Sequence, residues 1–116
     1  MSRITITKPD DWHIHLRDGD MLERTVNDVA AWANRAVVMP NLTPPVKNVA
    51  DATAYHSRIL AALEGFPQFE PLMTLYLTES TTPADIVAVQ NLWHEALLPP
   101  AIPNVDHAKI HVPAPP

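Results

Sequence analysis

The 116-residue chain has no cysteine, only two glycines and no concentration of basic residues. Without cysteine, neither a disulfide scaffold nor a thiolate metal site can form, so a bound metal would need His, Asp, Glu or a modified Lys. Eight Lys and Arg against 13 Asp and Glu give a net charge of −5, which excludes the basic surface of a nucleic-acid-binding protein. No apolar run approaches the ~18 residues of a membrane span, and the N-terminus lacks the apolar core of a signal peptide. We therefore expect a cytoplasmic protein that binds neither nucleic acid nor membrane.

Proline is as abundant as glycine is scarce. It occurs 13 times, and six of these prolines lie in the last 18 residues. Proline ends helices and interrupts strands, so the chain changes character near residue 90. We expect a folded part over residues 1–89 and an atypical Pro-rich tail over residues 90–116, which is disordered or arises from a frameshift in the coding DNA.

Hydrophobic periodicity predicts three successive strand–helix units. Such repeats imply an α/β fold with a parallel sheet and outer helices, in which functional residues lie at the C-terminal ends of the strands. Asp20 is the expected N-cap of the first helix, and Thr82 that of the third. The predicted segments are strand 4–7 resuming at 12–16, helix 21–33, strand 36–39, helix 51–63, strand 69–77 and a helix from residue 83.

Two histidines, His13 and His15, lie two residues apart in an apolar run. Alternate side chains of a strand share one face, so both imidazoles should point to the same side. Two converging neutral imidazoles suit a borderline-soft metal, most commonly zinc. Taken alone, such a pair is more often simply exposed or buried in the core.

Two further polar residues lie near the predicted strand ends. Arg17 follows the histidines and could hold an anionic substrate, or could be a surface charge that pairs with Asp18 or Asp20. Asn41 follows the second predicted strand and could reach the same edge, although an Asn before a Pro-rich loop is often a turn former.

Three segments of the chain, residues 10–20, 35–46 and 71–78, resemble the N-terminal part of dihydroorotases, in the shorter bacterial-type form of the amidohydrolase superfamily. The combination of His-x-His-Leu-Arg-Asp with Met-Pro-Asn carries this resemblance, which extends over about residues 3–89. It implies a zinc-dependent (β/α)8 TIM barrel. It also implies reversible interconversion of dihydroorotate and N-carbamoyl-aspartate in pyrimidine biosynthesis.

The resemblance assigns roles to four residues. His13 and His15 resemble ligands of the more buried of two zinc ions, which would activate water and polarise the substrate carbonyl. Arg17 and Asn41 resemble the pair that holds the substrate carboxylate, in keeping with guanidinium and amide hydrogen bonding.

The resemblance is incomplete beyond the third helix. A (β/α)8 barrel takes about 250 residues, and this chain could supply about three of its eight units. The carbamylated lysine expected after the third helix has no counterpart in the segment 94–99, and no catalytic residue is assigned within this chain. We therefore expect an incomplete barrel and an inactive truncation of the enzyme.

Two alternatives remain open. The chain could be a non-catalytic βα interaction module, or a related cyclic amidase such as an allantoinase or hydantoinase. The Arg17 and Asn41 motifs weigh against the second, because they suit a substrate that bears a carboxylate. In either case an open sheet exposes hydrogen-bonding edges, which predicts a homo-oligomer or an aggregation-prone chain.

Overall fold

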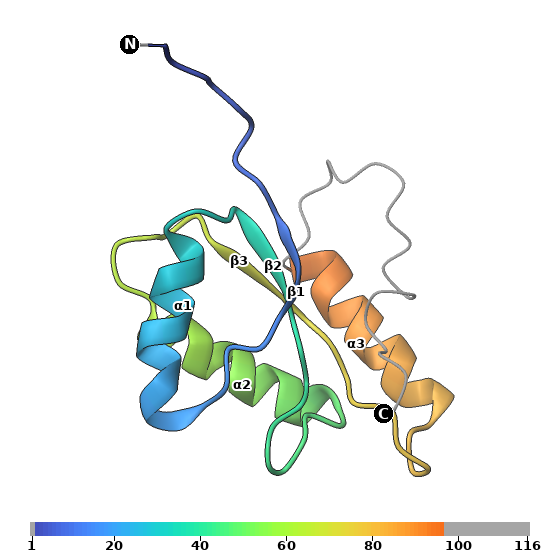
Figure 1. The fold of residues 1–116 in the computed structure, drawn as a ribbon. Helices are drawn as coiled ribbons and strands as arrows, with labels where there is room; N and C mark the ends of the chain where they lie inside the picture. Colours follow the sequence, from blue (N-terminus) through green and yellow to red (C-terminus); the bar gives the residue numbers. More distant parts are fainter. Residues whose placement is uncertain (1, 97–116) are drawn as a thin grey trace.

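The computed structural model describes the backbone of residues 2–96 and the burial of side chains as far as residue 91. The predicted order of three strand–helix units is confirmed (Figure 1). Residues 97–116, which form most of the predicted Pro-rich tail, lie outside the described residues. The elements are β1 (Asp11–Ile14), η1 (Gly19–Met21), α1 (Leu22–Ala30), β2 (Arg35–Val38), α2 (Val49–Ala62), β3 (Glu70–Met73) and α3 (Pro83–Ala96).

The three strands form one parallel sheet in the order β1-β2-β3. β2 and β3 pair in continuous register from Arg35 opposite Glu70 to Val38 opposite Met73, whereas the register between β1 and β2 shifts once. The Met39 amide donates to the Ile14 carbonyl at 2.9 Å, just beyond the end of β2. The segments that follow β1 and β2 therefore begin side by side at the C-terminal edge of the sheet, where functional residues collect in parallel α/β folds.

The main hydrophobic core lies between the sheet and the helices. Because adjacent residues of a strand face opposite sides, Ala36 and Val38 point into this core while Val37 points to the other face. There Val37 forms a second small cluster with Met39 and Leu72. The helices contribute these buried residues to the main core: Leu22, Val26, Val29 and Ala30 of α1, Ala52, Tyr55 and Ile59 of α2, and Val89 of α3.

The predicted strand over residues 4–7 is wrong. This segment has no regular secondary structure, and Ile4 and Ile6 are 86% and 73% exposed. It extends away from the helices and strands (Figure 1). Alternating side chains suit a strand, but a strand also needs a neighbour to pair its backbone groups, and none of the described residues provides one here.

Of the two predicted helix caps, the one at Asp20 is wrong and the one at Thr82 is confirmed. Asp20 is not an N-cap, because the 3-10 turn η1 precedes α1 and includes Asp20 itself. Thr82 does cap α3, since its hydroxyl accepts a hydrogen bond from the Asp85 amide at 3.2 Å. α2 has an unpredicted cap, in which the Asn48 side chain accepts from the Asp51 amide at 2.9 Å. Within residues 2–96, no helix is long and apolar enough to cross a membrane.

Candidate functional site

The two histidines of the His-x-His motif converge, as the strand alternation predicts. His13 lies in β1 and His15 follows directly after its end, and both side chains are exposed. Their Nε2 atoms are 3.2 Å apart, and the rings meet edge to face with centroids separated by 5.1 Å. The intervening Ile14 turns toward the core, which leaves the two imidazoles together on the other side.

The separation of the two nitrogens fits a shared metal ion. Two nitrogen ligands of a tetrahedral zinc, each at ~2.0–2.1 Å, lie about 3.3 Å from one another. A hydrogen bond between one protonated and one bare nitrogen gives a similar distance. Slight desolvation, the positive charge of Arg17 and the neighbouring His13 all lower the pKa of His15, which favours the neutral imidazole that binds metals.

The two imidazoles are only part of a metal-binding set. In the part of the chain that the structure describes, no group of three or more His, Cys, Asp or Glu side chains is placed to hold a metal ion. A closed structural zinc site has four protein ligands, and a catalytic one usually has three. His13 and His15 therefore fit zinc in chemistry and spacing but need further donors.

Arg17 lies in a turn beyond β1, which ends at Ile14, two residues before the predicted strand end at residue 16. Its φ of 62° lies in the left-handed region, which is uncommon for a residue other than glycine. Three consecutive residues of this turn are held by side chains from the helices. Thr25 of α1 donates to the Leu16 carbonyl at 2.6 Å, the Tyr55 hydroxyl donates to the Arg17 carbonyl, and Arg58 binds the Asp18 carboxylate.

The ion pair between Asp18 and Arg58 bears on whether Arg17 is a surface charge that pairs with Asp18. Both guanidinium contacts are within hydrogen-bond distance, at 3.0 and 2.8 Å, so Asp18 pairs with α2 rather than with Arg17. Partial burial opposes ionisation of Asp18. The hydrogen bonds from Arg58 and from the Gly19 amide outweigh it and lower the pKa of the carboxyl group. Among residues 2–96, Arg17 itself forms no ion pair, so its charge stays available.

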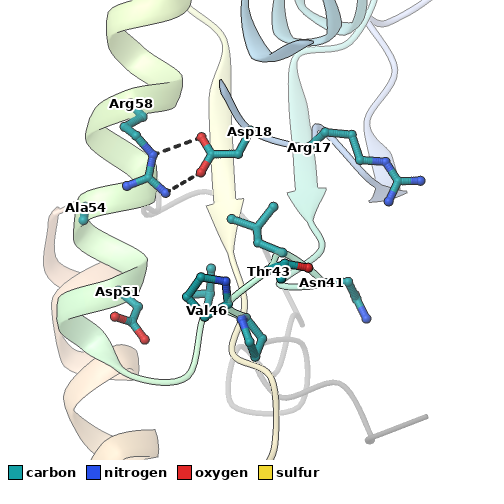
Figure 2. Close-up of a pocket in the computed structure, with 11 residues that line it drawn as sticks. Arg17, Asp18, Asn41, Thr43, Val46, Asp51, Ala54 and Arg58 are labelled. Atoms are coloured by element: carbon teal, nitrogen blue, oxygen red, sulfur yellow. Dashed lines mark hydrogen bonds and ion pairs between the residues drawn. The ribbon is translucent and has the colours of Figure 1, made fainter. Parts of the chain in front are cut away.

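Arg17 and Asn41 line the same cavity of about 420 Å³. Figure 2 shows Arg58 and Asp18 joined on the α2 side of this pocket, whereas Arg17 and Asn41 lie on the opposite side with their polar ends extending away from α2. The structure thus brings the two predicted carboxylate-binding residues to one pocket. Its other lining residues are Leu42, Thr43, Pro44, Pro45, Val46, Asp51 and Ala54.

Three residues that support this pocket were not found from the sequence. No sequence pattern predicts that these residues contact the turn after β1. Tyr55 belongs to the apolar stripe of α2, and Thr25 and Arg58 are ordinary polar helix residues. Burial, together with the negative charge of Asp18, raises the pKa of Tyr55, so its hydroxyl remains a protonated donor. Only the packing of α1 and α2 against the turn after β1 reveals their contacts.

Comparison with known proteins identifies long regions of similarity. No protein-family profile matches the chain. It is 58% identical over 90 residues to the dihydroorotase of Picosynechococcus sp., a match that covers 78% of this chain and 26% of that protein. It is 54% identical over 101 residues to the dihydroorotase of Ectopseudomonas mendocina, covering 85% of this chain and 29% of that protein. The chain therefore spans only about a quarter of the length of these curated relatives.

Solved structures agree with the sequence matches. A dihydroorotase from Campylobacter jejuni superposes with a TM-score of 0.67 and 39% identity, over 73% of this chain and 25% of that one. The dihydroorotase from Saccharomyces cerevisiae in complex with 5-fluoroorotic acid gives a TM-score of 0.66 and 27% identity, over 72% of this chain and 22% of that one. By sequence and by fold, this chain is a homologue of dihydroorotases, which are hydrolases, and corresponds to the N-terminal part of those longer proteins.

Proposed function

We propose that this chain supplies the first metal ligands and the carboxylate-binding pair of a zinc-dependent dihydroorotase. That enzyme interconverts dihydroorotate and N-carbamoyl-aspartate in the cytoplasm. One observation carries the proposal: two imidazoles with nitrogens 3.2 Å apart lie at the same sheet edge as a pocket that Arg17 and Asn41 share. The sequence identity to proteins named dihydroorotase supports the reaction class.

The histidine pair would hold zinc, and zinc would act as a Lewis acid on the carbonyl of the cyclic amide. The role of His13 and His15 is to present neutral nitrogen atoms at a fixed separation. The lowered pKa of His15 helps, because a protonated imidazole cannot bind a metal.

Arg17 and Asn41 would bind the carboxylate that the substrate carries on its ring. A guanidinium offers two parallel N–H donors to a carboxylate, and the amide of Asn41 can add a neutral hydrogen bond. The homologue from Saccharomyces cerevisiae was solved with 5-fluoroorotic acid, a pyrimidine that also bears a carboxylate. A cyclic amide without a carboxylate would leave the charge of Arg17 unmatched, which favours dihydroorotate over the substrates of other cyclic amidases.

The isolated chain would bind zinc weakly and turn over little substrate. No third metal ligand joins His13 and His15 within residues 2–96. The cluster of Val37, Met39 and Leu72, on the face away from the main core, supports a (β/α)8 barrel, in which that face would line the interior. Further strands would then supply the remaining ligands and the general base.

The proposal is tested by measuring zinc content and dihydroorotate hydrolysis on the purified chain supplied with zinc. We expect well under two zinc ions per chain and little or no turnover. The double variant His13→Ala/His15→Ala should lose the zinc that the wild type retains, whereas His56→Gln, which removes a histidine of α2, should not. Unchanged zinc in the double variant would show that the metal lies elsewhere, and robust turnover would show that the chain holds a complete site.

A further inference from the structure

We propose that Tyr55 is a positioning residue for Arg17. Its hydroxyl holds the Arg17 carbonyl and thereby keeps Arg17 in the left-handed conformation in which it lines one cavity together with Asn41. The inference rests on the proposed function in one respect, namely that the ligand of Arg17 is a carboxylate. Tyr55 acts through Arg17 and has no contact of its own with the ligand.

The backbone of Arg17 needs such support. At a φ of 62° the Cβ atom of an L-residue crowds the following carbonyl oxygen, so most side chains avoid this region. A residue in a sparsely populated conformation persists only where its surroundings fix it, and such residues cluster at binding sites. Gly19, two residues further on, also has a positive φ, of 61°, but as a glycine it adopts this conformation without that crowding.

Tyr55 is suited to this task because its own position is fixed. Its side chain is fully buried in the main core, 38 residues away from Arg17 in sequence, and only the hydroxyl reaches the turn. Arg58 lies three residues along α2, so it shares a helix face with Tyr55. Its guanidinium carbon lies 5.3 Å from the centre of the Tyr55 ring, and it binds the next residue of the turn, Asp18.

α2 therefore contacts two consecutive residues of the turn, Arg17 through its backbone and Asp18 through its side chain. These contacts fix the backbone of Arg17 and hence the direction in which its side chain leaves the chain, while its guanidinium forms no ion pair within the described residues. An arginine whose backbone is already fixed loses less conformational freedom when its guanidinium binds a carboxylate. Loss of the Tyr55 hydroxyl should consequently weaken binding without any change in the charge of the pocket.

The first test uses the full 116-residue chain without ligand. Tyr55→Phe keeps the ring and removes only the hydroxyl, and NMR scalar and residual dipolar couplings report the φ angle of Arg17. We expect a positive φ in the wild type and an average over several conformations in Tyr55→Phe. The matched control is Tyr76→Phe, which removes the hydroxyl of the other tyrosine and should leave the couplings of Arg17 unchanged. An unchanged positive φ in Tyr55→Phe would overturn the proposal.

A second measurement covers the case in which Tyr55→Phe fails to fold. In the wild type, the hydroxyl proton of Tyr55 should exchange slowly with water and show nuclear Overhauser contacts to the Asp18 amide, because the Arg17 carbonyl holds it nearby. A rapidly exchanging hydroxyl without these contacts would overturn the proposal even without the variant.

The third measurement titrates N-carbamoyl-L-aspartate into each protein. We expect Tyr55→Phe to bind about fivefold more weakly than the wild type, which is the effect of one ordinary hydrogen bond, and Arg17→Ala to lose binding. Equal binding by Tyr55→Phe and wild type would contradict positioning. If the wild type itself fails to bind, the carboxylate site of the proposed function is wrong, and the couplings of Arg17 alone then decide the role of Tyr55.

Discussion

Asp18 and Arg58 illustrate how a single ion pair makes the stability of this fold depend on pH. Hydrogen bonds from Arg58 and the Gly19 amide overcome the effect of partial burial and lower the pKa of Asp18 from its ordinary value of 3.8. The ionised carboxylate therefore stabilises the fold above this value, and the contribution is lost as the pH falls through the lower pKa of the folded state.

The variant Asp18→Asn should remove this contribution. We expect its free energy of unfolding at neutral pH to fall by about 1 kcal/mol or less, because the pair is partly exposed and solvent weakens it. Denaturant titrations at a series of pH values measure the effect. Asp28→Asn breaks the more exposed pair with Arg24 and serves as a control that should change stability less. An Asp18→Asn protein as stable as the wild type at neutral pH would contradict the prediction.

The contribution of Glu70 to the stability of the fold should depend on pH in the opposite direction to that of Asp18. Burial, reinforced by the charge of Asp10 and opposed by that of Arg35, raises the pKa of Glu70 above 4.5, and its buried Oε2 atom has no hydrogen-bond partner among the residues that the structure describes. Between 4.5 and the raised value, the folded protein binds more protons than the unfolded chain. The contribution of Glu70 to the free energy of unfolding therefore decreases as the pH rises through this window.

Glu70→Gln should abolish this part of the pH dependence, because the amide carries no charge at any pH in the window. Thermal melts recorded from about pH 4 to pH 7 would show the wild type losing more stability with rising pH than the variant. Glu79→Gln, at an exposed position, should retain the wild-type profile. Parallel profiles for wild type and Glu70→Gln would show that Glu70 does not titrate abnormally.

At the scale of elements, α2 connects the core to the candidate site. Its N-terminus is closed by two reciprocal hydrogen bonds. The Asp51 amide donates to Asn48 Oδ1 at 2.9 Å, and the Lys47 amide donates to Asp51 Oδ2 at 3.1 Å. The same helix carries Tyr55 and Arg58, which contact Arg17 and Asp18. Loss of the helix cap should therefore also weaken the support of the loop that contains Arg17.

Removal of the α2 cap should be measurable in the whole fold. We expect Asn48→Ala to lower the free energy of unfolding by about 1 kcal/mol, since the Asp51 amide loses its acceptor. Asn48→Asp keeps an acceptor and adds a charge that suits the helix N-terminus, so it should be close to wild type. Urea unfolding followed by circular dichroism distinguishes the two variants, and equal midpoints would argue against a stabilising cap.

The lengths of the strands show where periodicity misleads. The apolar run from residue 69 to 77 predicted one long strand, but β3 covers only Glu70–Met73. Thr74 and Leu75 remain buried beyond its end, and the Thr74 hydroxyl donates to the Val38 carbonyl at 2.5 Å. An apolar run reports burial, whereas the length of a strand depends on the partner strand, and β2 ends at Val38.

For the molecule as a whole, the open sheet predicts self-association. β2 is paired on both sides, whereas β1 and β3 each have one neighbouring strand among the described residues. Strand edges with unpaired backbone groups are templates for pairing with other chains. We expect light scattering to show oligomers or aggregates that grow with protein concentration. A sharp monomer peak together with cooperative melting would contradict this.

The sequence by itself determined the order of three βα units, the shared side of His13 and His15, and the cap at Thr82. Each depends on the spacing of side chains within short segments, because the local backbone geometry of a strand or helix sets the direction in which each side chain points. Tertiary structure alone decided the conformation of Arg17 and its support from Tyr55 and Arg58. Those contacts join residues about 40 positions apart, and they exist only because α2 packs against the sheet at one particular height and rotation.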